Sequence, residues 1–337
     1  MRAVVLVGGL GTRLRPLTLT RPKQMLPIVN RPMIEHVVGH LGRHGVDEVV
    51  LSLGYRPDGF RHAYPDATCA GVRLHYAVEP ERLDTAGAIS FAAHHAGIDE
   101  RFLVLNGDVL TDLDVTAFVA FHDQAGAEGT IALHKVDDPS RYGVVPTDPD
   151  GRVIAFVEKP PPGTAPSSMI NAGTYVLEPD VLDRIVPGRP MSVEREVFPG
   201  MVADGTLFAA DDDAYWIDTG TPREYIQAQL DLIDGRRNPA DAAAAVHPTA
   251  VVDPGAAVRR SVVGPGSEVA AGACVEDSVL LDGVRVGEGA LVASSIVGSG
   301  STVAGGARVE GCSVVGDAQV VGPGERLDGV RRPEACP

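Results

Sequence analysis

The chain has 337 residues, of which 44% are hydrophobic and 22% are charged, so it is long enough for two globular domains. Its formal net charge of −16 argues against binding to nucleic acids or anionic membranes, although it is compatible with a local cationic pocket for a small anion. The first apolar run ends at Gly8-Gly9, and no later stretch approaches the length of a membrane span. We therefore expect a cytoplasmic protein that binds neither nucleic acid nor membranes.

Short apolar runs alternate with amphipathic stretches between Met1 and Gly235. They predict strands at Ala3–Val7, Glu48–Leu53, Arg73–Ala77 and Phe102–Leu105, and helices near Ile34–His44 and Gly87–Ala96. Such alternation is typical of an α/β fold whose mostly parallel sheet is covered by helices on both faces. Ligands of these folds bind at the carboxyl ends of the strands, where the loops at 8–13 and 106–108 are expected.

The loop after the first predicted strand is rich in glycine and in cations. Gly8, Gly9 and Gly11 leave backbone N–H groups uncovered, and Arg13 and Lys23 supply positive charge, which together suit a polyphosphate. The loop is neither a P-loop, since no Gly-Lys-Ser/Thr follows, nor a dinucleotide fingerprint, since the third glycine is missing. A tight turn with solvated cations remains the alternative at this point.

The chain from residue 236 onward follows a different pattern. Residues 236–245 are predicted to form a linker, and from 246 to 327 aliphatic residues recur with a period of 17 that is subdivided six, six and five. This period fits neither a helix nor an ordinary strand, and it predicts a parallel β-helix of hexapeptide repeats. One inward column is expected to contain Val246, Val263, Leu280, Val297 and Val314.

The main alternative for this region is a low-complexity disordered tail, which would not maintain such a register. Residues 328–337 are predicted to form a C-terminal tail. Because coils of this kind commonly pack between subunits, we expect a homo-oligomer assembled through the β-helix.

A series of motifs runs in order from Leu6 to Gly220. They are Leu6-Val7-Gly8-Gly9-x-Gly11-Thr12-Arg13-Leu14-Arg15-Pro16-Leu17-Thr18, Pro22-Lys23, Thr85-Ala86-Gly87, Asn106-Gly107-Asp108-Val109, Arg141-Tyr142-Gly143-Val144-Val145, Phe156-Val157-Glu158-Lys159-Pro160, Ile170-Asn171-Ala172-Gly173-x-Tyr175, Ser192-Val193-Glu194-Arg195-Glu196-Val197-Phe198-Pro199 and Trp216-Ile217-Asp218-x-Gly220. The series resembles the nucleotide-sugar pyrophosphorylases, or sugar-1-phosphate nucleotidyltransferases, and among them most closely the mannose-1-phosphate guanylyltransferases. The resemblance implies a Rossmann-like nucleotidyltransferase domain over 1–235, followed by the left-handed β-helix that many members carry.

The reaction implied by this resemblance explains the residue types. An oxygen of a sugar-1-phosphate attacks the α-phosphorus of a nucleoside triphosphate, and pyrophosphate leaves. Because the attacking phosphate is already anionic, cations and a metal ion do the work that a general base does elsewhere. The resemblance assigns the nucleotide phosphates to Arg13 and Lys23, a Mg²⁺ ion to Asp108 and Asp218, and the sugar phosphate to Lys159.

The resemblance also implies two sets of binding residues. The nucleotide-binding set is Leu6, Gly8, Gly9, Gly11, Thr12, Arg13, Lys23, Asp84, Thr85 and Gly87. The sugar-phosphate set is Asn106, Gly143, Glu158, Lys159, Asn171 and Gly173. Asp84 stands where the family usually has glycine, and its carboxylate either accepts hydrogen bonds from guanine or caps the helix that begins there. Neighbouring strand residues such as Glu158 and Lys159 reach one ligand only through a local irregularity, which Pro160 at the strand end favours.

The expected products are GDP-mannose and pyrophosphate from GTP and mannose-1-phosphate. One alternative is a glucose-1-phosphate nucleotidyltransferase that uses UTP, dTTP or ATP, since few hydrogen bonds discriminate the bases. Another is a non-catalytic regulatory subunit that senses a nucleotide-sugar. An acyltransferase activity of the β-helix would need a histidine base, and only His247 lies there. The histidines of the helical stretches, such as His36, are expected at the surface, and Mn²⁺ is an alternative to Mg²⁺.

Overall fold

The structure of the protein is a computed structural model that describes residues 1–54, 57–238 and 244–334. The chain folds into two compact units. The first comprises Met1–Gly8 and Val37–Trp216, and the second comprises Gly9–His36 and the chain from Ile217 onward. Residues 239–243 of the predicted linker and 335–337 of the predicted tail lie outside the described residues.

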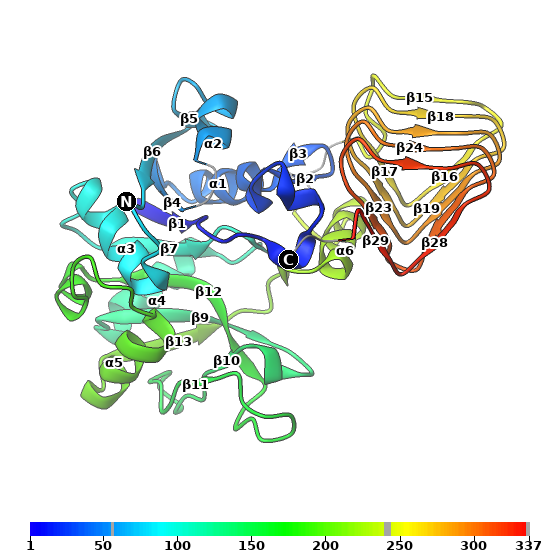
Figure 1. Ribbon diagram of the computed structural model, residues 1–337. Helices are drawn as coiled ribbons and strands as arrows, with labels where there is room; N and C mark the ends of the chain where they lie inside the picture. Colours follow the sequence, from blue (N-terminus) through cyan, green and yellow to red (C-terminus); the bar gives the residue numbers. More distant parts are fainter. Residues whose placement is uncertain (55–56, 239–243, 335–337) are drawn as a thin grey trace. The chain divides into compact units, whose positions relative to one another are not determined.

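A ten-stranded mixed sheet forms the centre of the first unit (Figure 1). Its strands are β1 (Arg2–Leu6), β4 (Glu48–Leu53), β5 (Thr68–Cys69), β6 (Val72–Val78), β7 (Phe102–Asn106), β9 (Gly129–Lys135), β10 (Gly143–Val144), β11 (Val157–Glu158), β12 (Met169–Leu177) and β13 (Leu207–Asp211). The main path runs β11-β10-β12-β7-β1-β4-β6-β5, with β9 between β12 and β13. The short strands outside this sheet are β2 (Pro27–Ile28), β3 (Arg31–Pro32), β8 (Val109–Thr111) and β14 (Trp216–Asp218).

The strands predicted for this unit correspond to β1, β4, β6 and β7, and they form the parallel centre of the sheet. β1 pairs in parallel with β4 and β7, and β4 pairs in parallel with β6. The predicted α/β fold is therefore confirmed. Strand β12 pairs antiparallel with β7, β9 and β10. It adds an antiparallel extension to the sheet that the sequence pattern did not reveal.

Helices cover the sheet of the first unit. The helices of the chain are α1 (Met33–Arg43), α2 (Asp58–Ala63), α3 (Asp84–His95), α4 (Val115–Ala125), α5 (Phe198–Asp204) and α6 (Pro222–Ile233), and the short turns are η1 (Thr12–Leu14), η2 (Leu17–Leu19), η3 (Lys23–Met25), η4 (Pro139–Arg141), η5 (Pro179–Arg184) and η6 (Val193–Val197). Helix α3 packs against β1, β4 and β6 through buried Ala86, Ile89 and Ala92, whose small size lets the helix lie close to the sheet. Helix α4 packs against β9 and β13, and α5 packs against β13.

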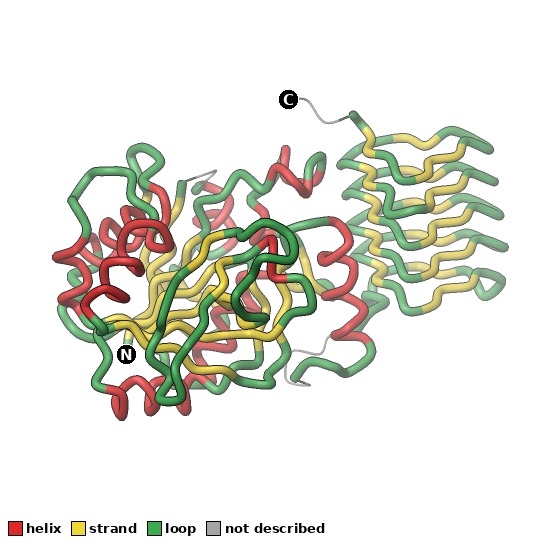
Figure 2. The backbone as a smooth tube through the Cα atoms, turned by 90° about the horizontal axis from the view of Figure 1, so that it is seen from below, coloured by secondary structure: helices red, strands yellow, loops and turns green. Residues whose placement is uncertain are grey.

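The C-terminal part of the second unit is a stack of coils with three parallel sheets of five strands each (Figure 2). Their strands are β15 (Val251–Val252), β16 (Ala257–Arg259), β17 (Val262–Val263), β18 (Glu268–Val269), β19 (Cys274–Glu276), β20 (Val279–Leu280), β21 (Arg285–Val286), β22 (Leu291–Ala293), β23 (Ile296–Val297), β24 (Thr302–Val303), β25 (Arg308–Glu310), β26 (Val314–Val315), β27 (Val320–Val321), β28 (Arg326–Asp328) and β29 (Arg331–Arg332). Buried valines and leucines from every coil fill the interior. The predicted β-helix is confirmed.

The predicted inward column is wrong at both ends. Val246 keeps the predicted register by pairing with Val263 but is 39% exposed, and the last member is not in register. Val297 pairs with Val315 rather than with Val314, so the last step of the column is longer than the earlier ones by a single residue. Three earlier corners turn through a single residue of positive φ, such as Ser294 (φ 46°), whereas Gly311 (φ 66°) and Cys312 (φ 64°) turn the later one together. The extra residue shifts every side chain beyond it by one position. Val321 therefore pairs with buried Val303, and Val320, which follows Val314 at the predicted spacing of six, is 65% exposed.

A ladder of buried serines runs along the same edge of the stack. Ser261, Ser278, Ser295 and Ser313 each donate a hydrogen bond from Oγ to a carbonyl close by in the chain. Each of the first three also accepts a hydrogen bond from the backbone N–H of the next serine in the ladder. The hydroxyls therefore satisfy backbone groups that the sharp corners leave without strand partners.

His36 is fully buried in α1 and lies 3.0 Å through Nε2 from the carbonyl oxygen of Ile28. The expectation that it lies at the surface is wrong, because the helix face that carries it packs inward. Among the described residues, none of the helices is both long and apolar enough to cross a membrane.

Candidate active site

The glycine-rich loop follows β1 and leads into η1. Gly11 has a φ of +60°, and a Cβ atom there would lie 2.9 Å from Cγ2 of Thr18 and 3.2 Å from Cβ of Lys23. The hydroxyl of Thr18 donates a hydrogen bond to the carbonyl of Gly11 at 2.8 Å. Glycine is thus required at 11 by both conformation and space, whereas Gly9 and Thr12 are exposed and open to a ligand.

Arg13, Lys23 and Asp218 come together in the second unit. Lys23 is 5% exposed, and its Nζ lies 3.9 Å from Oδ1 of Asp218. A Cβ atom on Gly220 would lie 2.6 Å from Nη2 of Arg13 and 2.9 Å from Oδ1 of Asp218, so the guanidinium and the carboxylate both rest against this glycine. The structure therefore brings two predicted phosphate ligands and one predicted metal ligand to one place.

Sequence reasoning did not identify Gly220 as a site residue. It closes the motif Trp216-Ile217-Asp218-x-Gly220, and that spacing was the only signal for it. Its role is to leave space: any side chain there would occupy the position of the Arg13 guanidinium.

The predicted sugar-phosphate residues of the first unit lie on the adjacent strands β7, β10, β11 and β12, except Lys159, which directly follows β11. The register of β12 shifts between Asn171 and Tyr175, at Gly173 with φ +75°. A Cβ atom on Gly173 would lie 2.5 Å from Nδ2 of Asn106. Asn171 accepts from Gly173 N–H and donates to the Tyr175 hydroxyl, each at 2.9 Å, and burial raises the pKa of that hydroxyl. Asn171 thus holds the bulge that places Gly173 directly against the Asn106 side chain.

Glu158 and Lys159 point to the same side of the chain. Lys159 has a φ of +48°, and its Nζ lies 3.0 Å from Oε1 of Glu158. The predicted irregularity therefore exists, and it lies at Lys159 itself, before Pro160. A Cβ atom on Gly143 would lie 2.6 Å from Cζ of Phe156 and 3.1 Å from Oε2 of Glu158, so Gly143 gives these side chains room. The Lys159 side chain is 60% exposed, so its ammonium group is accessible to solvent while it pairs with Glu158.

The predicted nucleobase residues lie at the start of α3. Thr85 Oγ1 donates to Oε2 of Glu194 at 2.7 Å and accepts from the N–H of Val193 at 2.9 Å. A Cβ atom on Gly87 would lie 2.9 Å from the carbonyl oxygen of Arg189. Thr85 and Gly87 therefore hold the segment 189–194 against α3. Glu194 lies in one of the nine motifs, but the sequence alone predicted no role for it.

Asp84 adopts a left-handed conformation (φ +57°) and is exposed. Its Oδ1 accepts from the adjacent N–H of Thr85 at 3.0 Å, and Leu83, not Asp84, stands at the N-cap of α3. The capping interpretation is therefore wrong in its geometry. The positive φ gives a physical reason why glycine is usual here.

Replacing Asp84 by glycine is expected to give a more stable protein than replacing it by alanine, by about 1 kcal/mol, because alanine retains the cost of the left-handed conformation. Urea unfolding of the two variants measures this difference. Equal midpoints, or a more stable alanine variant, would contradict it.

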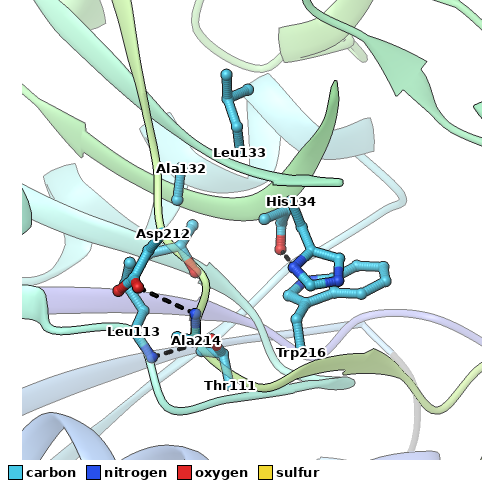
Figure 3. A pocket seen from close by; sticks show the side chains of 10 residues that line it. Thr111, Leu113, Ala132, Leu133, His134, Asp212, Ala214 and Trp216 are labelled. Carbon is cyan, nitrogen blue, oxygen red and sulfur yellow. Dashed lines mark hydrogen bonds between the residues drawn. The ribbon is translucent and has the colours of Figure 1, made fainter. Parts of the chain in front are cut away.

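Trp216 and His134 stack beside a small pocket of the first unit (Figure 3). Their ring centroids are 5.0 Å apart, and Nε1 of Trp216 donates to the carbonyl of Ala172 at 2.9 Å. Burial lowers the pKa of His134 below its ordinary value of 6.5. Trp216 is the only tryptophan of the chain and stands just before Asp218, so its fluorescence reports on this region.

We expect the fluorescence of Trp216 to stay constant as the pH falls to about 6.5 and to decrease only below that value. A protonated imidazole quenches indole, and the lowered pKa of His134 delays its protonation to more acidic solution. A fluorescence titration tests this, and His134→Gln should remove the transition. A midpoint at or above about pH 6.5 would show that His134 is more solvated than the structure indicates.

The two predicted metal ligands lie in different units. Asp108 is half-buried in the turn between β7 and β8, and Asp218 ends β14. Among the described residues, no group of three or more histidine, cysteine, aspartate or glutamate side chains is placed to hold a metal ion. A site formed by these two carboxylates with phosphate oxygens therefore stays a prediction.

Comparison with known proteins tests the predicted family. The sequence pattern of the family described as Nucleotidyl transferase matches residues 2–235, and that of the GMPPB C-terminal domain matches residues 241–330. Mannose-1-phosphate guanylyltransferase of Mycobacterium tuberculosis is 42% identical over 274 residues, which are 79% of this chain and 76% of that protein. Mannose-1-phosphate guanyltransferase of Schizosaccharomyces pombe is 45% identical over 230 residues, 67% of this chain and 62% of that protein.

A solved structure is similar to this chain in sequence and fold. The crystal structure of HddC from Yersinia pseudotuberculosis complexed with GMP-PN is 31% identical, has a TM-score of 0.58, and covers 68% of this chain and 97% of that chain. The first family pattern spans the segment in which the nine motifs occur, and the second spans the β-helix. The resemblance drawn from the motifs is thus confirmed: this chain belongs to the nucleotidyl transferase family and carries a GMPPB C-terminal domain.

Proposed function

We propose that the protein transfers a guanylyl group from GTP to mannose-1-phosphate, giving GDP-mannose and pyrophosphate. The observation that carries the phosphoryl chemistry is the cluster of Arg13, Lys23 and Asp218 beside the glycine-rich loop. The choice of guanine and mannose rests on the relatives, which bear the name mannose-1-phosphate guanylyltransferase, and on the solved relative in complex with GMP-PN.

The residues present suit this displacement. A phosphate oxygen of the sugar-1-phosphate forms a bond to the α-phosphorus while the bond to pyrophosphate breaks, and no proton has to be removed. The planar Arg13 guanidinium bridges two phosphate oxygens, and Lys23 contributes a second positive charge from a buried position. Gly8, Gly9, Gly11 and Thr12 offer backbone N–H groups to the triphosphate, and Leu6, Asp84, Thr85 and Gly87 border the nucleoside.

Enzymes of this family generally use a divalent metal ion. The two carboxylates fit a hard cation, because both offer oxygen donors and Oδ1 of Asp218 is buried beside Lys23 and Arg13. We infer that Asp108 and Asp218 hold Mg²⁺, which would neutralise charge on the phosphate oxygens.

The sugar-1-phosphate is proposed to bind along β10, β11 and β12. Lys159 pairs with its phosphate, and Glu158 accepts hydrogen bonds from sugar hydroxyls. Gly143 and Gly173 let the backbone approach the ring, while Asn106 and Asn171 border it.

The remaining predictions concern the whole chain. We propose a nucleotidyltransferase domain over 1–235, a linker over 236–245 and a β-helix that begins at 246. The predicted end of the β-helix at 327 and the tail over 328–337 are not kept, because β29 (Arg331–Arg332) pairs with β26 in the third sheet of the stack. We also propose a cytoplasmic homo-oligomer that assembles through the β-helix and binds neither nucleic acid nor membranes, in keeping with the net charge of −16.

Pyrophosphate release tests the reaction. The purified protein with Mg²⁺ is assayed with ATP, GTP, CTP, UTP and dTTP against mannose-1-phosphate, glucose-1-phosphate and N-acetylglucosamine-1-phosphate. We expect release from GTP with mannose-1-phosphate, and no release from an Asp108→Ala variant. Release confined to a glucose-1-phosphate pair would identify the other enzyme class. A thermal shift with GDP-mannose but no release from any pair would identify a regulatory subunit.

A further inference from the structure

The segment that carries Arg13 touches the last coils of the β-helix. Both lie in the second unit: the segment runs from the glycine-rich loop through η1 and η2 to η3, and the coils contain β23, β26 and β29. Three separate contacts join them. Arg13 takes part only through its main-chain carbonyl, so no side chain assigned to the nucleotide or the sugar is used.

Asp317 makes the first contact. Its Oδ2 accepts from Oγ1 of Thr20 at 2.6 Å and from Nη2 of Arg21 at 3.0 Å, while its Oδ1 accepts from the N–H of Ser299 at 2.9 Å. Arg21 also donates to Oγ of Ser299 at 3.1 Å. The Asp317 side chain is 15% exposed. Arg21 lies two residues before Lys23 in the chain. One half-buried carboxylate therefore fastens the end of η2 to two successive coils.

Arg331 and Gly316 make the second and third contacts. Nη2 of Arg331 donates to the backbone carbonyl of Arg13 at 2.8 Å. A Cβ atom on Gly316 would lie 3.0 Å from Cβ and Cγ of Pro16, which is buried, so the coil backbone lies directly against this proline. The main-chain carbonyl of Arg13 and the ring of Pro16 are thus in contact with the β-helix, whereas the Arg13 side chain stays exposed for its ligand.

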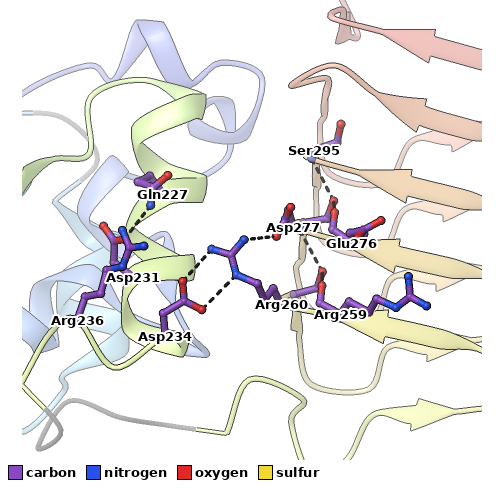
Figure 4. A network of polar contacts seen from close by, with 11 residues as sticks. Gln227, Asp231, Asp234, Arg236, Arg259, Arg260, Glu276, Asp277 and Ser295 are labelled. Atoms are coloured by element: carbon purple, nitrogen blue, oxygen red, sulfur yellow. Dashed lines mark hydrogen bonds and ion pairs between the residues drawn. The ribbon is translucent and has the colours of Figure 1, made fainter.

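A polar contact at the other end of the stack holds α6 (Figure 4). Arg260 donates from Nε and Nη2 to the two carboxylate oxygens of Asp234, at 3.1 and 2.8 Å, and from Nη1 to Asp277 at 2.8 Å. Helix α6 in turn uses Gln229 to bind the carbonyl of Pro27, just after η3. Both sides of the segment 13–27 are therefore fixed to the β-helix, one directly and one through α6.

We infer that the β-helix positions the phosphate-binding loop. Arg331 acts as a positioning residue through the main-chain carbonyl of Arg13, and Asp317 acts through the side chains of Thr20 and Arg21. The inference rests on the proposed function only where it concerns GTP. Holding the loop before the nucleotide arrives removes part of the ordering cost from binding, because a site that is only partly populated in its competent form binds with proportionally lower affinity.

Hydrogen exchange on the protein without substrates tests whether the β-helix holds the phosphate-binding loop in place. Asp317→Ala and Arg331→Met are compared with Asp282→Ala, a matched control, because Asp282, Ser299 and Asp317 occupy the same corner in successive coils. We expect amides of 9–25 to exchange about tenfold faster in the first two variants and at the original rate in the control. Unchanged rates at 9–25 in either test variant that folds, or faster exchange only within the β-helix, would overturn the inference.

Steady-state kinetics test the consequence for nucleotide. We expect the KM for GTP to rise about tenfold in Asp317→Ala while kcat and the KM for the sugar-1-phosphate stay within about twofold, because bound GTP reorders the loop. A merely structural role would lower the amount of active enzyme and leave KM unchanged, which would overturn the inference. If no substrate pair reacts, the proposed function fails alone, and the exchange rates still decide the positioning role.

Discussion

Replacing Asp218 by asparagine is expected to lower kcat/KM for GTP by about 10³-fold. Oδ1 of Asp218 lies 3.9 Å from Nζ of Lys23 and is buried beside the space that Gly220 leaves for Arg13. The substitution preserves shape and removes the charge that orients both cations and that would bind the metal ion. Pyrophosphate release at saturating Mg²⁺ measures the loss.

The matched control for this variant is Asp253→Asn. Asp253 is a carboxylate of the same unit whose Oδ1 accepts from the N–H of Gly255 at 2.8 Å, and asparagine retains that acceptor. We expect full activity in the control. If Asp218→Asn kept kcat/KM within about tenfold of the original protein, Asp218 would have no part in the chemistry and the proposed metal site would lose one of its two ligands.

Replacing Gly220 by alanine is expected to lower kcat/KM by about 10²-fold, because displacement of a catalytic group by about an ångström costs that much. The new Cβ would stand 2.6 Å from Nη2 of Arg13, so the guanidinium has to move. Since that group is the far end of a flexible and exposed side chain, the melting temperature should change little. Activity and thermal unfolding are measured on the same preparation.

Gly200→Ala provides the comparison, because Gly200 lies in α5 and its nearest neighbour to a new Cβ would be Nη1 of Arg184 at 3.6 Å. Both its activity and its fold should be retained. Loss of stability in Gly220→Ala that matches its loss of activity would mean that the glycine serves the fold rather than the placement of Arg13.

The sequence predicted the elements whose periodicity is local. Strands β1, β4, β6 and β7 follow from short apolar runs, and the coils follow from the regular hexapeptide repeat, because in each case the pattern and the burial have the same period. Strand β12 escaped detection because its pairing is antiparallel and interrupted by the bulge at Gly173. The serine ladder repeats in step with the valines, but a serine gives no signal of burial until its backbone partners are known.

The candidate site was predictable in its residue types and not in its geometry. The motifs identified Arg13, Lys23 and Asp218, which the structure brings together. The conformations of Asp84 and Lys159, both with positive φ, depend on neighbours that no single-residue preference encodes. Likewise, the role of Gly220 is defined by a side chain that is distant in the sequence, as the contact with Arg13 shows.

The number of coils in the β-helix has a mechanical meaning. Arg260 meets α6 near one end of the stack, and Asp317 meets η2 near the other, so the coils between them act as a spacer of fixed length. Successive strands in such a stack are separated by about 4.8 Å. Removing a single coil between these two contacts would shorten the spacer by that amount, farther than a hydrogen bond can stretch, so insertions and deletions of whole coils should be tolerated only beyond Arg331.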